Sequence, residues 1–233
     1  DNMNYAMAVE KFTSAYTLAV QENLKERAAY AALNLSYLYM RLENDERARY
    51  YVGMGFEHIR SIEHPQLLAQ LHCQSARLKV DQKDHYGGDA ELALALEIAE
   101  NTDNEWLLQS VRMEFAKSYL RISRDDLAMI LFKGILIRGI FLTNMELTVS
   151  SVYGITLTVL AKQSVFGTVT TTYDIETIRR EIGKDAMDHV WSLEIPFTLL
   201  EKTKAYFRQG LENFPGQLKA AADTKFAQLL LYQ

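Results

Sequence analysis

The stretch DERARYYVGMGFEHI, residues 45–59, decides the fold. Its small residues Ala48 and Gly55 lie on either side of the larger Val52, in the order small, large four residues later, and small three residues after that. On an α-helix these positions share one face, and small residues on that face let a neighbouring helix cross closely. The stretch therefore predicts the second helix of a closely packed antiparallel pair.

The same spacing recurs near the N-terminus and in the middle of the chain, at Ala8, Phe12 and Ala15, and at Ala128, Phe132 and Ile135. A helix preceding two of these stretches shows a second pattern: a large apolar or aromatic residue, a small residue directly after it, and a tyrosine three residues later. This pattern falls on Leu35, Ser36 and Tyr39, and on Phe115, Ala116 and Tyr119. Two helices that repeat at the same offset predict a repeat protein.

These helix pairs resemble the tetratricopeptide (TPR) superfamily, whose repeat is about 34 residues long. The resemblance covers roughly residues 1–139. It implies an all-α fold, a right-handed superhelix of antiparallel helix pairs (an α-solenoid), in which the first helix of each pair lines a concave face that binds a peptide or a partner protein.

The unit between the two patterns fits less well. Pro65–Val80 is predicted as its first helix and Asp89–Ala99 as its second, joined by the linker DQKDHYGGD, residues 81–89. We interpret Gly87–Gly88 as a hinge in this linker. Because the linker is too long for a standard repeat, successive units are expected to start at uneven intervals.

The last third of the chain is predicted as a helical cap. Met145–Gln163 is one further helix, followed by SVFGTVTTTY, residues 164–173, whose β-branched residues favour a loop or a short extended segment. Asp174 is an N-cap candidate for the helix that follows, with Gly183 as its stop. Residues 184–210, kinked or divided at Pro196, and residues 217–232 complete the helices. We expect residues 1–163 and 164–233 to form the repeats and the cap of one domain.

The composition limits the class of protein. The 233 residues carry a net charge of -5, which argues against nucleic-acid binding by this segment. Cys73 is the one cysteine, so an internal disulfide and a cysteine-based zinc site are excluded and a reducing compartment is expected: the cytoplasm, or the nucleus of a eukaryote. No window is long and apolar enough to predict a membrane span. Residues 1–7 look like the inside of a helix, so we expect an upstream part of the protein.

The resemblance implies which side chains face the ligand. In the first helices of three successive units, the candidate binding residues are Tyr30, Leu33, Asn34, Tyr37 and Arg41, then Gln74 and Arg77, then Met113, Lys117 and Arg121. Aromatic rings supply contact area at a low entropic cost, and Arg donates to carboxylates and carbonyls. The alternative, that Tyr30 and Tyr37 only pack between helices, is equally compatible with the sequence. Of the three groups that bind a peptide carboxylate in some TPR domains, Asn34 alone is in place.

No catalytic pattern stands out. The five histidines do not have the i, i+4 spacing of a helical metal site, and neither a Gly-x-Ser-x-Gly turn nor a phosphate-binding loop is present. The sequence therefore predicts a protein–protein interaction scaffold without enzymatic activity, metal or cofactor. The alternative is the ligand- or peptide-sensing regulatory domain of a TPR-containing transcriptional regulator. A sensor should enclose a pocket, whereas a scaffold should present an open groove.

Overall fold

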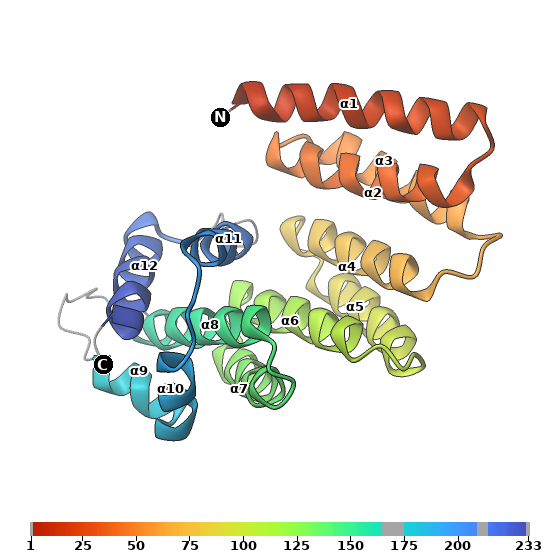
Figure 1. Ribbon diagram of the computed structural model, residues 1–233. Coiled ribbons are helices and arrows are strands. Elements are labelled where there is room, and N and C mark those ends of the chain that lie inside the picture. Colours follow the sequence, from red (N-terminus) through yellow and green to blue (C-terminus); the bar gives the residue numbers. More distant parts are fainter. Residues whose placement is uncertain (1, 165–174, 209–213, 232–233) are drawn as a thin grey trace. The chain divides into compact units, whose positions relative to one another are not determined.

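The computed structural model describes residues 2–164, 175–208 and 214–231, and in these ranges all regular structure is α-helical, with no strand (Figure 1). The all-α prediction is therefore confirmed. The chain divides into two compact units, Asp1–Val111 and Arg112–Gln233, and the division falls inside one helix, α6. The division into repeats and a cap at residue 163 stays a prediction.

The helices of the repeat begin at a constant interval. They are α1 (Asn2–Gln21), α2 (Lys25–Arg41), α3 (Asp45–Ile59), α4 (Pro65–Asp81), α5 (His85–Glu100), α6 (Glu105–Arg121), α7 (Asp125–Phe141) and α8 (Met145–Ser164). From α2 to α8 the starts are evenly spaced, so a pair of helices repeats at twice this interval, as from Lys25 to Pro65. This unit is longer than a TPR repeat, and the expected unit length and uneven starts were therefore wrong.

Five of the turns between these helices share one conformation. Each has three residues, and the middle one has a positive φ between 52° and 66°: Asn23, Glu43, Lys83, Ser123 and Thr143. The third residue of each turn donates its N–H to the carbonyl five residues earlier, as Asn44 does to Tyr39 at 2.8 Å. This is the bonding of a Schellman helix end, here without glycine. The common turn gives the same reversal at these five connections, whereas the α3–α4 and α5–α6 connections are longer and have no residue with a positive φ.

The expected long linker at residues 81–89 is wrong. The turn is Gln82–Asp84, and the Asp84 carboxylate accepts the Gly87 N–H at 2.9 Å, so Gly87 lies in the first turn of α5. Gly88 is buried, and a Cβ there would come within 2.5 Å of the Val80 side chain. Gly88 is thus the small residue at a close helix crossing rather than a hinge, and it opens the small–large–small pattern that continues at Leu92 and Ala95.

In the first unit, α2 packs against α1 and α3, and α4 packs against α3 and α5. The residues of the deciding stretch lie in this core: Ala48 and Val52 are buried beside Leu35 and Tyr39, as predicted. A Cβ on Gly55 would come within 2.5 Å of Leu71. In α1 the same pattern is only partly buried, since Ala15 is exposed.

In the second unit, α8 is the central helix. Every residue from 147 to 161 is buried, because α7, α11 and α12 pack around it together with α9. The bounds of the surrounding helices are α9 (Ile175–Ile182), α10 (Lys184–Trp191), α11 (Phe197–Arg208) and α12 (Gly216–Leu231). Burial on all sides leaves hydroxyl groups without water, and those of Thr148, Ser151, Thr156 and Thr158 each donate to the carbonyl four residues earlier.

The helices predicted for the C-terminal third are present in the described residues. The helix expected from residue 184 is divided near Pro196, which is one of the two predicted outcomes: α10 ends at Trp191 and α11 begins at Phe197. Gly183 ends α9 with a φ of 92°, as its role as a stop predicts. Ser164 belongs to α8, and the rest of the SVFGTVTTTY segment and Asp174 lie outside the described residues.

Candidate functional site

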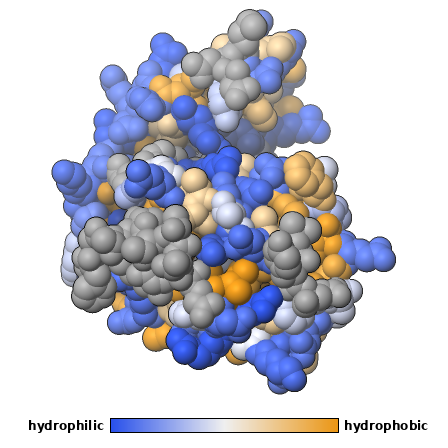
Figure 2. All heavy atoms as spheres, turned by 90° about the vertical axis from the view of Figure 1, so that its left-hand side faces the viewer, coloured by the Kyte–Doolittle hydropathy of each residue, from blue (hydrophilic) through white to orange (hydrophobic). Residues whose placement is uncertain are grey.

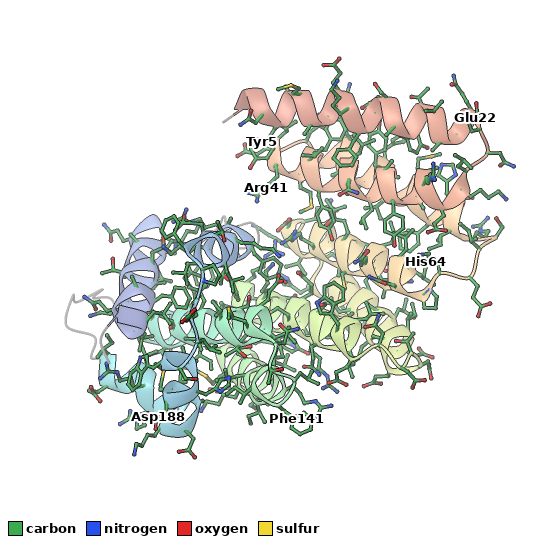
Figure 3. All side chains as sticks on the ribbon, in the orientation of Figure 1. Tyr5, Glu22, Arg41, His64, Phe141 and Asp188 are labelled. Atoms are coloured by element: carbon green, nitrogen blue, oxygen red, sulfur yellow. The ribbon has the colours of Figure 1, made fainter. Side chains whose placement is uncertain are left out.

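The candidates that were predicted to face inward occupy equivalent places in the repeat. Because α2, α4 and α6 begin at Lys25, Pro65 and Glu105, the residues Tyr37, Arg77 and Lys117 share one position along the first helix. Asn34 and Gln74 share another, as do Leu33 and Met113, and Arg41 and Arg121. Figure 3 shows side chains of both units, which are described separately below.

On α2 the candidates form a half-buried stripe. Tyr30, Asn34, Tyr37 and Arg41 are spaced four, three and four residues apart and are each partly accessible, whereas Leu33 beside them is buried. Asn34 donates its amide to the Tyr30 carbonyl at 2.8 Å. Tyr30 and Tyr37 also pack against the core formed by Ala29, Leu33, Ile59, Leu67 and Leu71. Each of the two tyrosines therefore packs on the core with part of its ring and remains partly accessible to solvent.

Further aromatic side chains lie at both ends of this stripe. Tyr30 hydrogen-bonds with His64 Nε2 at 3.3 Å, and burial, helped by the charge of Glu26, raises the pKa of the Tyr30 phenol. At the other end the Arg41 guanidinium lies 6.0 Å from the Tyr5 ring of α1. In Figure 3, Tyr5 and Arg41 lie together at the end of α1 and α2 that is away from Glu22 and the α1–α2 turn. We refer to Tyr30, Asn34, Tyr37 and Arg41 as the α2 stripe.

On α4 the candidates are buried. Gln74 donates its amide to Ser36 Oγ at 3.0 Å and approaches Met40 Sδ at 2.8 Å, so it joins α4 to α2. Its Oε1 atom is buried without a hydrogen-bond partner among the described residues. Arg77 is likewise buried. Ligand binding by Gln74 or Arg77 stays a prediction, and it would require these side chains to move.

In the second unit, Met113 and Lys117 are buried and Arg121 is partly accessible. Only 1% of Lys117 is exposed, because its ammonium lies 3.5 Å from the centre of the Tyr206 ring of α11. The same ammonium lies 3.4 Å from Glu114 Oε1, which accepts the Tyr206 hydroxyl at 2.5 Å. Tyr206 of α11 thus covers the position on α6 that was predicted to face inward.

A partly buried ion network, which the sequence did not predict, joins α4 and α5. Glu91 accepts from His72 Nδ1 at 2.7 Å and from Lys79 Nζ at 2.6 Å, and the His72 ring packs on Phe56. Burial opposes ionisation of Glu91, but these two hydrogen bonds together outweigh it and lower the pKa of Glu91 to about 2. Glu91 lies on a different helix from His72 and Lys79, so no spacing within one helix relates it to them.

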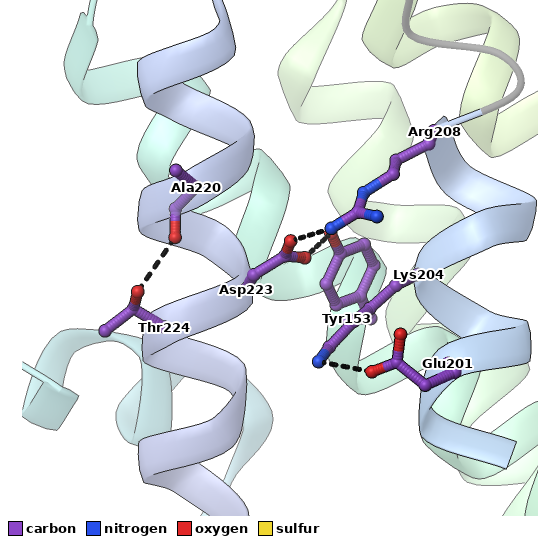
Figure 4. A network of polar contacts seen from close by, with 7 residues as sticks. All are labelled: Tyr153, Glu201, Lys204, Arg208, Ala220, Asp223 and Thr224. Atoms are coloured by element: carbon purple, nitrogen blue, oxygen red, sulfur yellow. Dashed lines mark hydrogen bonds and ion pairs between the residues drawn. The ribbon is translucent and has the colours of Figure 1, made fainter. Parts of the chain in front are cut away.

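A second polar network connects three helices of the second unit (Figure 4). The hydroxyl of Tyr153 in α8 donates to Asp223 Oδ1 of α12 at 2.6 Å, and Arg208 of α11 pairs with the other carboxylate oxygen. Burial and the adjacent Asp223 raise the pKa of the Tyr153 phenol far above its usual range, so the phenol stays protonated. The network fixes α11 and α12 against α8 and has the character of a structural support.

Two surface hollows adjoin α9 and α10. One, of about 440 Å³, is lined by Ile137 and Ile140 of α7 and by residues 182–186. The other, of about 490 Å³, is lined by Arg179, Arg180, Lys184 and Trp191 among others. Both are open to solvent, and neither includes a candidate residue predicted from the sequence.

Two further findings concern the described parts of the chain. They contain no group of three or more His, Cys, Asp or Glu side chains placed to hold a metal ion. None of their helices combines the length and apolar character needed to cross a membrane. Cys73 is buried and lies within α4, inside the helix predicted over residues 65–80.

Comparison with protein-family models, with curated proteins and with solved structures finds no match. The resemblance to TPR proteins therefore rests on the repeat pattern of this chain alone.

Proposed function

We propose that the chain is a TPR-like interaction scaffold that binds a peptide or a partner protein on the inward face of its first helices. The proposal is supported by the even succession of helix pairs, whose two helices are joined by a common turn. Stacked repeats of this kind expose an extended surface on which a ligand contacts several units.

The observation that carries the proposal is the α2 stripe. Its side chains combine two aromatic rings, an amide and a guanidinium, all partly accessible and held on one helix. Aromatic and Arg side chains of this kind supply most of the energy at protein interfaces, and a helix presents them in a fixed arrangement. Tyr206 covers Lys117, the residue of α6 that corresponds to Tyr37, so a ligand would gain more contact energy at the α2 stripe than at α6.

The alternative function, a sensor of a small ligand, would be favoured by an enclosed pocket beside the first helices. The hollows at α9 and α10 are open and lie on other helices, so neither supports a sensor. The partly accessible aromatic and Arg side chains of the α2 stripe favour the scaffold.

The proposal is tested by selecting binders from a displayed peptide library on the immobilised protein. The double substitution Arg41→Glu and Asn34→Ala should weaken binding of the selected peptides at least tenfold, because it removes a hydrogen-bond donor and reverses a charge within the stripe. The matched control is Arg49→Glu combined with Gln21→Ala, at exposed positions off the stripe.

Circular dichroism should show unchanged helix content in both variants. Equal loss of binding in the control, or peptides that bind both variants as tightly as the wild type, would place the ligand elsewhere and contradict the proposal.

A further inference from the structure

Helix α7 carries an exposed apolar stripe. Leu127, Ile130, Ile137 and Phe141 are exposed to 42, 66, 67 and 73% of their surface. With the exposed Gly134 between them, they are spaced alternately three and four residues apart, which places them on one side of the helix. We call these five residues the α7 stripe.

The α7 stripe can be compared with the corresponding positions of the second helices in the earlier units, α3 and α5. The positions of Ile137 and Phe141 are occupied by Glu57 and Ser61 at α3, two units earlier, and by Glu97 and Asn101 at α5, one unit earlier. All four of these residues are exposed, as polar residues on an outward face should be. Among α3, α5 and α7, only α7 has a face that is apolar along its whole length. Contiguous apolar surface of this kind marks a site that another molecule covers.

Exposed apolar residues elsewhere are arranged differently. On the side drawn in Figure 2, hydrophilic residues cover most of the surface and apolar residues form separate patches. The α7 stripe differs from such patches because its large aliphatic and aromatic side chains follow one another along a single helix.

The order of residues in the stripe is nearly symmetric about Gly134. Two large residues precede the glycine by seven and four residues, and two follow it by three and seven. If a second copy of α7 crosses it antiparallel at Gly134, Ile130 of each copy lies opposite Ile137 of the other, and Leu127 lies opposite Phe141. A self-complementary patch of this kind is the requirement of a two-fold interface.

Gly134 is unexplained by the chain's own packing. A Cβ at this position would meet nothing within 4 Å, although glycine destabilises the interior of a helix relative to alanine. At a crossing between two copies, the missing side chain would let the two backbones approach closely. The interface thus gives a reason for a residue that the single chain does not need.

We propose that the α7 stripe is a homodimer interface, in which α7 of one copy crosses α7 of a second copy antiparallel at Gly134. Four side chains of this size and exposure offer on the order of 500 Å² per copy, which is near the lower limit for a specific interface. The dimer should therefore be reversible and depend on concentration. It uses a helix other than the one that carries the α2 stripe, so it does not depend on the proposed function.

Disulfide cross-linking of the full chain tests the arrangement, because the one natural cysteine, Cys73, is buried. Gly134→Cys should give a cross-linked dimer on mild oxidation, since the two cysteines meet at the crossing. Ile130→Cys alone should not, but an equimolar mixture of Ile130→Cys with Ile137→Cys should. Efficient cross-linking of Ile130→Cys by itself would indicate a parallel pair and overturn the proposal.

Sedimentation of the wild-type protein over micromolar to millimolar concentration tests the dimer without a new thiol. Ile137→Lys should abolish the dimer, whereas Leu94→Lys, at the position in α5 equivalent to Gly134, should leave it unchanged. A wild-type chain that stays monomeric throughout, or a dimer that survives Ile137→Lys, would overturn the proposal. So would a different protein bound to the stripe in place of the second copy.

Discussion

The ammonium group of Lys117 lies 3.5 Å from the centre of the Tyr206 ring, and only 1% of the lysine is exposed. The two residues are far apart in the sequence, one on a first helix of the repeat and the other on α11. The ring attracts the cation, and the Tyr206 hydroxyl donates to Glu114 one turn away on α6. A single tyrosine thus attaches α11 to the C-terminal half of α6.

Replacement of Tyr206 should destabilise the protein more when the ring is lost as well as the hydroxyl group. Tyr206→Phe keeps the ring over Lys117 but loses the hydrogen bond to Glu114, which is worth about 1–2 kcal/mol. Tyr206→Ala also removes the ring and leaves the buried ammonium without it, so we expect a loss of about 3 kcal/mol. Denaturant unfolding measures both values.

Tyr86 is the control for this series, since 90% of it is exposed. Tyr86→Phe should leave the midpoint of unfolding unchanged. If Tyr206→Phe and Tyr206→Ala were equally destabilising, the ring over Lys117 would contribute nothing.

The ion network at Glu91 predicts a dependence of stability on acid pH. The pKa of Glu91 is about 2 in the folded chain and near 4.5 when unfolded, so folding favours the ionised form. Its contribution is complete above pH 4.5 and is lost as the pH falls from 4.5 toward 2. Allowing for screening, we expect Glu91→Gln to lower the free energy of unfolding by roughly 1–2 kcal/mol at pH 7.

Unfolding measured at pH 7 and at pH 3 tests this assignment. The difference between the wild type and Glu91→Gln should narrow at the lower pH. Glu97→Gln, at an exposed position on the same helix, should show no such change. A difference that stays constant with pH would mean that Glu91 is not held ionised by His72 and Lys79.

The sequence was sufficient to predict helix pairs. It also contains a regular interval between helix starts, which the apolar residues alone do not show. Four helices are capped by the side chain of the residue that precedes them: Asn44, Asp84, Asn104 and Asn144. The distance between successive caps is one or two times the interval between helix starts. Capping residues at a fixed interval can be found in the sequence itself. They place the start of α5 at residue 85 and leave no room for the expected linker.

Other features could not be predicted, because they depend on which helices meet. Tyr206 covers Lys117 from a helix that is distant in the sequence, and periodicity within α6 cannot show what lies over its inward face. The positive φ of Glu43, Lys83 and Thr143 was equally hidden, since these residue types do not favour that conformation. The repeated turn imposes it on whichever residue occupies the place.

Two glycines should respond to alanine in opposite directions. At Gly154 in α8, a Cβ would come within 2.5 Å of the buried Phe132 ring, so Gly154→Ala should destabilise by about 1–3 kcal/mol. At Gly53 in α3, a Cβ would meet nothing within 4 Å, so Gly53→Ala should stabilise by about 0.5–1 kcal/mol through helix propensity. Thermal unfolding compares the two, and changes of the same sign would contradict the close approach of α7 and α8.

The repeat also indicates where a missing cap can be added. Leu24 precedes α2 with φ -87° and ψ 74° and makes no side-chain cap, whereas Asp84 has nearly the same backbone, φ -82° and ψ 71°, and caps α5. Because the backbone is already in the capping conformation and Leu24 is 41% exposed, Leu24→Asn should stabilise the protein by about 0.5–1 kcal/mol. Asn44→Ala, which removes a working cap, should have the opposite effect of similar size. Unfolding in denaturant measures both, and a loss of stability in Leu24→Asn would show that the apolar contacts of Leu24 outweigh a cap at this turn.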